Sequence, residues 1–467
     1  MSTSFEQVRT RVASQKSLLP SLYGQVDFDR MPERFTEDAS EAIVKDRAPM
    51  GVAMTAYELE LVRAYTMLGD IVADAYAALM PAYSFRQLID MLREACDHGV
   101  EHVEGAPPEL VAFIRDMERV PDWVDMDLVR EGARLDLNPT ANAAPYAIRG
   151  AFIATFLNKY SALPMALTGT LSNETAARRV RETAHFFACT VLPGALDRNG
   201  EGFKAAAMVR LMHSMVRVNV LRSGRWDASV YGVPIPQVDQ MPAGLIPIFL
   251  LAFRLLREGR HTFTPGERAQ VELSRYRCFL LGLPEDLLAD TPEGIVRMMT
   301  ARNTTLRESF DDETCGSLIR ATLAAYLPLD RSVASQVFDQ LERRFAKLLF
   351  VEAFLGGDRE LARKIGIEIG TDDVVVGALV GAGITLQMKA FELAEWVPGI
   401  REVANLILVK RVEQLLASYG HARFTTDASK YRSAKGGKRG ASGRAGRSSR
   451  RSPDSTVRRR RPRTSGL

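Results

Sequence analysis

The sequence predicts an all-α protein, a single large helical bundle domain followed by a basic C-terminal tail. Apolar residues recur at helical spacing through most of the 467 residues. No stretch keeps the alternation of apolar and polar residues that is typical of a strand. Beyond Thr426 the composition changes to serine, glycine and arginine, which cannot build a core, so we expect a disordered tail. With 46% apolar residues, the chain can fill a sizeable core.

Four helices are expected in the first third of the chain. Apolar side chains fall near one face over residues 57–80, which predicts one long amphipathic helix that ends before Pro81. Shorter helical patterns cover residues 85–98, 108–119 and 127–135.

Two apolar helices are expected next. The first covers residues 144–167, and Pro164 predicts a break within it, because proline lacks the N–H that a helix interior needs. The second covers residues 174–191, and Ser172 or Asn173 can cap its N-terminus.

The remaining helices are marked by caps and by apolar periodicity. Helical patterns cover residues 206–220 and 239–258. The sequence TPGE at 264–267 is a capping box with proline at the first helical position, and Thr291-Pro292 opens a further helix. Helical patterns of moderate quality then continue to about residue 416.

The formal net charge of +4 conceals an acidic body and a basic tail. Residues 430–467 contain fourteen lysines and arginines against the single acid Asp454, which leaves 47 basic and 56 acidic residues before them, a balance of −9. The tail can bind nucleic acid or an anionic membrane weakly, by charge alone. A solvated extension without a specific partner is an equally good interpretation.

The cysteines and the N-terminus indicate a cytoplasmic protein. Four cysteines lie far apart without a C-x-x-C pair, which predicts reduced and mostly buried thiols. The first twenty residues have no apolar signal region. The longest apolar stretch, residues 374–388, falls short of the roughly 20 residues that cross a bilayer. We therefore expect no transmembrane helix, and at most a peripheral membrane contact.

Residues 206–220 are apolar around most of the helix except for one polar stripe. Arg210, His213 and Arg217 lie on one face, at positions i, i+3 and i+7. A helix that is apolar on its other sides is normally buried, and buried guanidinium groups need anions to compensate them. An imidazole between two arginines can ligate a metal while the arginines bind carboxylates of a bound group. The alternative is a structural network of arginines and carboxylates within the protein.

A second helix carries a mixed polar and aromatic face. Arg179, Glu182, Thr183 and Phe186 share it, again at helical spacing. If this helix packs opposite the first, the two faces would bracket a planar cofactor. The alternative is a surface face with an exposed Arg179–Glu182 ion pair. His185 lies near the same face and is a rival candidate for a metal ligand.

Short motifs follow one another in a fixed order over residues 57–299. In order and spacing they resemble the rubber oxygenase (latex-clearing protein) family, which also includes a membrane-bound oxygenase of fungal mycophenolic acid synthesis. The motifs are PDWVD at 121–125, TGTL at 168–171, RxxET at 179–183, LPG at 192–194, GxG at 200–202, RxxHxxxR at 210–217, GVPIPQVD at 232–239 and YRCFLLGLP at 276–284.

The resemblance implies a helical domain, globin-like in character, that holds haem b. His213 matches the family's proximal iron ligand, and Arg210 and Arg217 match the arginines that frame it. Arg179 and Thr183 match polar residues of the distal side. The implied protein is a haem-dependent oxygenase that acts with dioxygen on an apolar substrate.

The chain departs from the family pattern at two points. Glu182 stands where the best-known members have a lysine that can bind the iron, and a carboxylate would instead act as a base or orient water. We therefore expect Arg179, Glu182 and Thr183 to form the catalytic group. The rubber-cleaving members also carry a glutamate further upstream, whereas residues 159–166 contain no acid. Rubber cleavage is therefore not expected. We expect a lipid or isoprenoid-like substrate instead.

These expectations divide the chain into four parts and leave one alternative function. The parts are an N-terminal extension (1–54), an oxygenase-like haem-binding core (55–300), a helical continuation of the same domain (301–425) and the tail (426–467). The alternative is a helical module without enzymatic activity that binds an anionic or lipid ligand through Arg210 and Arg217.

Overall fold

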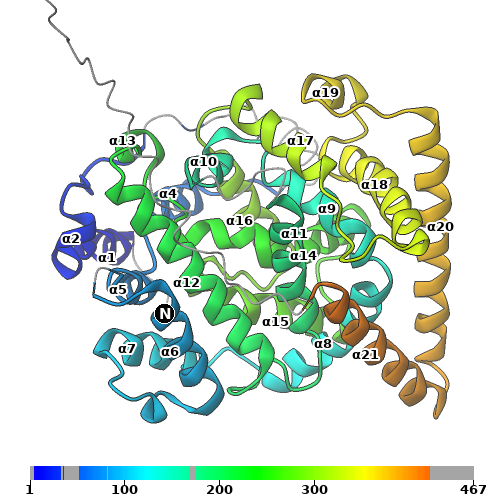
Figure 1. Ribbon diagram of the computed structural model, residues 1–467, viewed down its shortest axis with the longest axis horizontal. Helices are drawn as coiled ribbons and strands as arrows, with labels where there is room; N and C mark the ends of the chain where they lie inside the picture. The colour runs from blue at the N-terminus through cyan, green and yellow to red at the C-terminus, as the bar shows by residue number, and fades with distance from the viewer. Residues whose placement is uncertain (1–4, 33–34, 36–51, 81, 169–174, 421–467) are drawn as a thin grey trace, which may run out of the picture. The chain divides into compact units, whose positions relative to one another are not determined.

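The computed structural model describes residues 5–32, 35, 52–80, 82–168 and 175–420. Helices make up the regular structure of these residues, and the one β-type pairing among them is an isolated bridge between Phe35 and Arg307. The predicted all-α class is therefore confirmed (Figure 1). Residues 1–431 form one compact unit. The subdivisions predicted after residues 54 and 300 stay predictions, and the predicted tail lies outside the described residues.

The first two helices belong to the main core. Helix α1 (Phe5–Leu18) packs on α4, and α2 (Pro20–Tyr23) follows it directly. Val8, Val12 and Tyr23 are buried in the same cluster as the central helices. The N-terminal part of the chain thus contributes to folding rather than only extending from the body.

The prediction of one long helix over residues 57–80 is wrong, because two helices occupy that range. Helix α4 (Ala56–Tyr65) ends before an irregular segment, and α5 (Ile71–Ala77) begins after Asp70, whose side chain accepts a hydrogen bond from the Ala73 amide (3.3 Å). In this irregular segment the carbonyls of Thr66 and Leu68 accept hydrogen bonds from the amides of Val233 and Gln237. The break therefore results from tertiary contacts. Pro81 lies outside the described residues.

The next three helices agree well with prediction. Helix α6 (Phe85–His98) has the predicted bounds, and α7 (Pro108–Glu118) ends one residue early. Helix α8 (Met126–Asn142) continues past the predicted end and accommodates Pro139. It packs on α15 and α21.

The apolar stretch 144–167 also divides into two helices, but not at Pro164. Helix α9 (Ala144–Ala154) ends before a turn, and α10 (Lys159–Thr168) begins where Asn158 accepts a hydrogen bond from the Tyr160 amide (3.1 Å). Pro164 lies inside α10. The capping residue therefore determines the boundary, whereas the proline is tolerated. The predicted caps of α11 (Ala176–Cys189), Ser172 and Asn173, lie outside the described residues.

Helix α12 (Glu201–Arg222) crosses the middle of the bundle (Figure 1). The capping box at Thr264 and the helix start at Thr291 are both confirmed. The other helices of this region are α13 (Ala228–Tyr231), α14 (Met241–Arg257), α15 (Pro265–Leu280) and α16 (Pro292–Thr304). Short helical turns occur here at Gln237–Gln240 and Glu285–Leu287, and elsewhere in the chain at Val100–His102 and Asp312–Gly316.

The C-terminal helices complete the unit and confirm the helical prediction up to residue 416. Helix α20, drawn in orange-yellow at one edge of Figure 1, lies beside α18. It is longer than the apolar stretch 374–388 suggested, and by length and composition it could cross a membrane. The helices are α17 (Ser317–Ala324), α18 (Val333–Phe354), α19 (Arg359–Lys364), α20 (Thr371–Ala394) and α21 (Ile400–Ser418).

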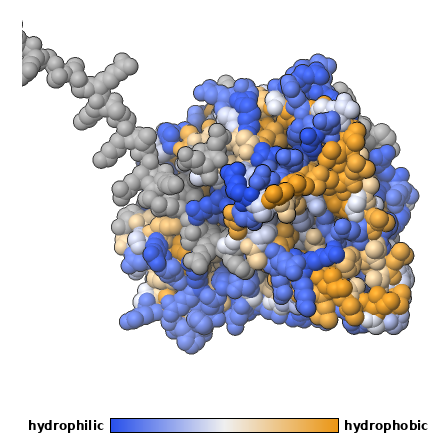
Figure 2. Space-filling view, turned by 45° about the vertical axis from the view of Figure 1, so that its right-hand side comes forward, coloured by the Kyte–Doolittle hydropathy of each residue, from blue (hydrophilic) through white to orange (hydrophobic). Residues whose placement is uncertain are grey.

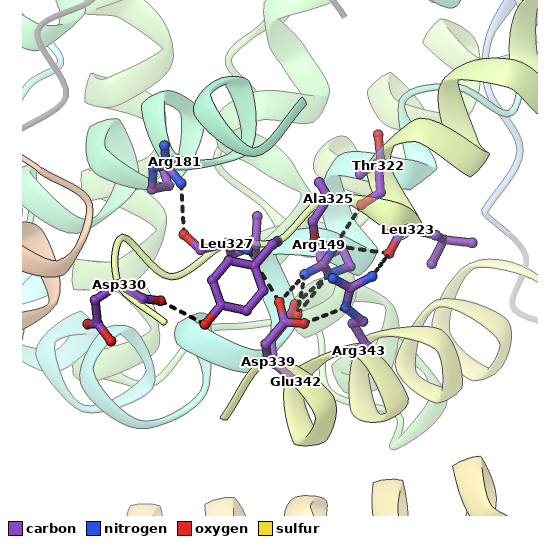
Figure 3. Close-up of polar contacts among 11 residues, drawn as sticks. Arg149, Arg181, Thr322, Leu323, Ala325, Leu327, Asp330, Asp339, Glu342 and Arg343 are labelled. Atoms are coloured by element: carbon purple, nitrogen blue, oxygen red, sulfur yellow. Dashed lines mark hydrogen bonds and ion pairs between the residues drawn. The ribbon is translucent and has the colours of Figure 1, made fainter. Parts of the chain in front are cut away.

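A buried ion-pair network joins α9 to α18 (Figure 3). Arg149 is fully buried, and its Nε lies 2.8 Å from Glu342 Oε2. Its Nη1 donates to the carbonyls of Thr322 (2.6 Å) and Ala325 (2.8 Å). One side chain therefore fixes two helices and the segment after α17 relative to one another.

The four cysteines are free and buried, as predicted. Burial raises the pKa of the Cys96, Cys189 and Cys278 thiols to about 12. These thiols are therefore almost entirely protonated at neutral pH and act as small core residues.

Candidate active site

The polar stripe of α12 faces α5 and the segment that follows α13. Arg210 and Arg217 are buried, whereas His213 between them is partly buried. Met212 and Met215, on neighbouring sides of the helix, are buried in the main hydrophobic core, as is Phe186 of α11. The helix therefore has the buried position that its composition predicts.

Arg210 is compensated by two aspartates of the chain. Its Nε lies 2.7 Å from Asp70 Oδ2, and its Nη2 lies 2.9 Å from Asp70 Oδ1 and 2.9 Å from Asp116 Oδ2. The guanidinium also lies 5.2 Å from the ring centre of Phe113. Burial opposes ionisation of Asp70, but the charge and hydrogen bonds of Arg210 outweigh it and lower the pKa of this carboxyl group.

Arg217 is also bound within the chain. It pairs with Asp74, and its Nε donates to the Pro234 carbonyl (2.9 Å). Its Nη2 donates to the Ile235 carbonyl. Asp74 in turn accepts a hydrogen bond from the Tyr23 hydroxyl (2.5 Å). The anions expected opposite the stripe are therefore aspartates of the protein itself. This arrangement is the alternative given above, a structural network of arginines and carboxylates within the protein.

The segment 232–240 closes over this stripe. Ile235 has a φ of 46°, an unusual backbone conformation for a β-branched residue, and its carbonyl accepts from Arg217. The amides of Val233 and Gln237 donate to the carbonyls of Thr66 (3.1 Å) and Leu68 (2.9 Å). The GVPIPQVD motif thus holds the irregular segment between α4 and α5 against α12.

The glycine of the motif at 276–284 approaches the same stripe. A Cβ atom at Gly282 would lie 2.4 Å from Gln237 Nε2 and 3.0 Å from Arg210 Nε. Gly282 also has a φ of +86°. Three motifs that are distant in the sequence therefore meet at Arg210.

His213 is held as a neutral imidazole. Burial, followed by the charges of Arg217 and Arg179, lowers the pKa of His213 to about 4. An interaction with the buried side chain of Gln240 acts in the opposite direction and does not offset these effects. A neutral imidazole keeps one nitrogen that can accept a hydrogen bond or bind a metal.

Helix α11 packs against α12 and brings the second polar group to the same region. Arg179 Nη1 lies 2.7 Å from Glu182 Oε2, and Arg178 Nε lies 3.2 Å from Glu182 Oε1. The Glu182 side chain is only 4% exposed, so the pair is not the exposed surface pair of the alternative interpretation. The charge of Arg179 contributes to the low pKa of His213, in agreement with the packing of α11 on α12.

The Arg149 network helps to position α11 (Figure 3). Arg181 of α11 donates to the Leu327 carbonyl (2.8 Å), and the Leu327 amide donates to Asp339 (3.3 Å). Arg149 contacts the same aspartate (3.4 Å). A chain of contacts therefore connects the helix of Arg179 and Glu182 to the α9–α18 pair.

Four residues that complete the site were not found from the sequence. Asp70, Asp74 and Asp116 compensate the arginines, and the Gln240 side chain interacts with His213. Asp70 and Asp74 have i, i+4 spacing, which was a usable signal, but they fell within a range taken as one amphipathic helix. Gln240 gives no signal of its own.

Acids also lie near the stretch 159–166, although they come from elsewhere in the sequence. Lys159 Nζ lies 3.2 Å from Glu308 Oε2 and 3.6 Å from Asp311 Oδ2. Among the described residues, no group of three or more His, Cys, Asp or Glu side chains is arranged to hold a metal ion. A haem iron, in contrast, needs one or two protein ligands, and His213 is a suitable one.

Comparison with known proteins places the chain in an oxygenase family. The model of the ER-bound oxygenase mpaB/B'/Rubber oxygenase catalytic domain matches residues 139–382, more than half of the chain. The chain belongs to this family and is an enzyme of the oxygenase type. The matched range extends well beyond residue 299, where the resemblance seen in the sequence ends, and it excludes the motif at 121–125.

A solved structure agrees with the fold. The structure of latex clearing protein in the closed state matches with a TM-score of 0.51 at 18% sequence identity, and the match covers 75% of this chain and 91% of that chain. At this identity the similarity supports the helical architecture. A search of curated proteins found no match to the sequence.

Proposed function

We propose that this chain is a haem b-dependent oxygenase that uses dioxygen to oxidise an apolar substrate, with His213 as the axial ligand. The observation that carries the proposal is the packing of α12, which carries the neutral His213, against α11, on which Arg179 is paired with the buried Glu182. The family supports oxygenase chemistry at the level of the reaction class.

The residues around His213 fit an axial-ligand role. The Gln240 side chain can accept the imidazole N–H, which leaves the lone pair of the other ring nitrogen for iron. The low pKa keeps the imidazole unprotonated at neutral pH. Ligand orientation and protonation are therefore both provided by the chain.

We assign Arg210 and Arg217 a positioning role toward the cofactor. Their contacts with Asp70, Asp74 and the carbonyls of residues 234 and 235 hold α12 against α5 and against the segment 232–240. The carboxylates of a haem would have to compete with these aspartates. The two arginines therefore fix the direction in which His213 points, and the aspartates of the chain occupy the positions that haem carboxylates would need.

When bound, haem supplies the electron chemistry that activates dioxygen. On α11, the Arg179 guanidinium can donate hydrogen bonds and the Thr183 hydroxyl can donate or accept one. Glu182, held by Arg178 and Arg179, is a carboxylate that can take up a proton or orient water. These three residues form the proposed catalytic group.

We propose a lipid or isoprenoid-like molecule as the substrate. The family acts on apolar molecules, and residues 159–166 lack the acid of the rubber-cleaving members. Phe187 of α11 is partly buried against the main core and is available to contact such a molecule.

The haem spectrum tests the proposal. Purified protein reconstituted with haem should show a Soret band and a pyridine haemochrome of the b type. His213→Ala should change the spectrum and weaken haem retention. The matched control is His185→Ala, which removes the rival histidine on α11 and should leave the spectrum unchanged. An unchanged spectrum in His213→Ala would exclude the assigned ligand.

The alternative of a binding module without enzymatic activity has less support. Arg217 donates to Asp74 and to two carbonyls, and Arg210 binds Asp70 and Asp116. The stripe is therefore already satisfied inside the chain and offers little to a free anionic ligand.

A further inference from the structure

Helix α20 exposes an apolar side to solvent along its whole length. Leu379, Leu386 and Leu393 are 68%, 73% and 69% exposed. Only 11% of the most apolar 18-residue stretch of the helix is buried. Figure 2, which brings this edge of the molecule forward, shows hydrophobic residues gathered there. Large exposed apolar surfaces of this kind mark interaction sites.

The apolar surface continues onto α21. Trp396, in the turn between the helices, is 83% exposed, and Val403 and Leu406 of α21 are 55% and 63% exposed. We refer to the surface made by Leu379, Leu386, Leu393, Trp396, Val403 and Leu406 as the α20–α21 face.

The opposite side of α20 is fixed to the body of the protein. A Cβ atom at Gly377 would lie 2.9 Å from Leu348 Cδ2, and one at Gly381 would lie 3.2 Å from the Phe345 ring. The absence of side chains at these glycines lets α20 lie close against α18. The apolar exposure therefore belongs to a helix that is part of the fold, not to a loosely attached segment.

We propose that the α20–α21 face docks on an anionic membrane surface, with α20 lying in the plane of the interface. Residues 374–388 contain no charged side chain, and Thr385 and Gln387 are their only side chains with hydrogen-bonding groups. Lipid acyl chains need no hydrogen bonds, whereas protein interfaces contain roughly one per 100–200 Å². Trp396 has the amphipathic aromatic ring that is favoured at the boundary of a bilayer.

Charge supports a membrane as the occupant of this surface. The chain continues from α21 into residues 421–467, and residues 430–467 carry fourteen lysines and arginines against Asp454. Each basic residue near an anionic membrane adds to the attraction. Stable peripheral binding generally needs two signals, such as an apolar insertion and a polybasic segment. This chain has both, one directly after the other.

A second copy of the chain is the competing occupant. Leu379, Leu386 and Leu393 recur every seven residues, as in a helix-to-helix seam. Lys389, however, lies on the same stripe, seven residues after Ala382, and its Nζ lies 3.1 Å from Glu392 Oε2. A parallel symmetric seam would bring two of these exposed ion pairs together, whereas at a membrane the lysine side chain can extend to the headgroups. Lys389 therefore favours the membrane.

Vesicle flotation of the full-length protein tests the proposal. The wild type should float with vesicles of phosphatidylcholine and phosphatidylserine, and added salt should weaken this binding. The double variant Leu379→Gln/Leu386→Gln should lose binding by about tenfold or more, because each leucine contributes apolar burial. Leu18→Gln/Leu250→Gln, which changes exposed apolar residues of α1 and α14, is the matched control and should bind like the wild type.

Tryptophan fluorescence locates the contact. Trp226 is buried and Trp123 only partly exposed, so a blue shift of emission on vesicle addition should come from Trp396 and should vanish in Trp396→Phe. Equal flotation of the double variant and the wild type would overturn the proposal. A second outcome would also overturn it: the wild type does not float, has twice the chain mass in light scattering, and becomes monomeric in the double variant. The face would then bind a second copy of the chain.

Discussion

Buried charges at the centre of the protein are compensated one by one by partners of the same chain. The sequence correctly predicts that Arg210 and Arg217 are buried and face anions, because only such anions offset the cost of burial. It does not reveal that the anions are Asp70 and Asp74, since a spacing within one helix carries no information about the helix opposite. The proposed role of His213 was suggested by its apolar flanks and its two arginines, but its interaction with Gln240 depends on tertiary structure.

The pKa of His213 predicts a pH-dependent contribution to stability. Its folded-state pKa of about 4 is below the ordinary value of 6.5, so the contribution of the neutral ring is complete above pH 6.5 and is lost as the pH falls toward 4. The unfolding free energy of haem-free wild type, minus that of His213→Gln, should rise with pH in this window by at most about 1.4 kcal/mol per unit.

The carboxylates titrate in both of these proteins, so the difference isolates His213. Urea unfolding at a series of pH values measures it. A difference that is flat between pH 4 and 6.5 would mean that His213 is not buried as a neutral ring.

At the scale of elements, local signals determined some boundaries and tertiary contacts determined others. The helix starts at Thr264 and Thr291 were predictable, because a side-chain cap is encoded within a few residues. The break between α4 and α5 was not, because its carbonyls bond to residues 233 and 237. The break before α10 was misplaced because Asn158, and not Pro164, determines it.

The contact between α9 and α18 depends on Arg149. Arg149→Met should lower the unfolding free energy by about 3–5 kcal/mol, because Glu342 would remain buried without its partner. The double variant Arg149→Met/Glu342→Leu should recover much of this loss. Denaturant unfolding of the two variants measures the difference. If both are equally destabilised, the Arg149 carbonyl contacts rather than the ion pair stabilise this contact.

On the scale of the whole molecule, composition predicted the helical class and the sharp change after Thr426. The family match over residues 139–382 shows that the enzyme domain reaches into helices to which the sequence assigned no role. The exposure of α20 was not foreseen, because its apolar composition is also typical of a core helix.

Removal of the residues after Thr426 should leave the fold unchanged. The fourteen basic residues would be lost, so binding to anionic vesicles should weaken and lose its salt dependence. The melting temperature should stay within about 1 °C of the wild type, because the composition of this segment cannot build a core. A marked fall in melting temperature would show that this segment packs on the body.

The central claim is that His213 binds the haem iron, and rescue of a cavity variant tests it most directly. The absorbance spectrum of His213→Gly reconstituted with haem should differ from that of the wild type, and added imidazole should restore the wild-type Soret position. A His213→Gly spectrum that matches the wild type without imidazole would contradict the claim, as would rescue by imidazole of His185→Gly instead.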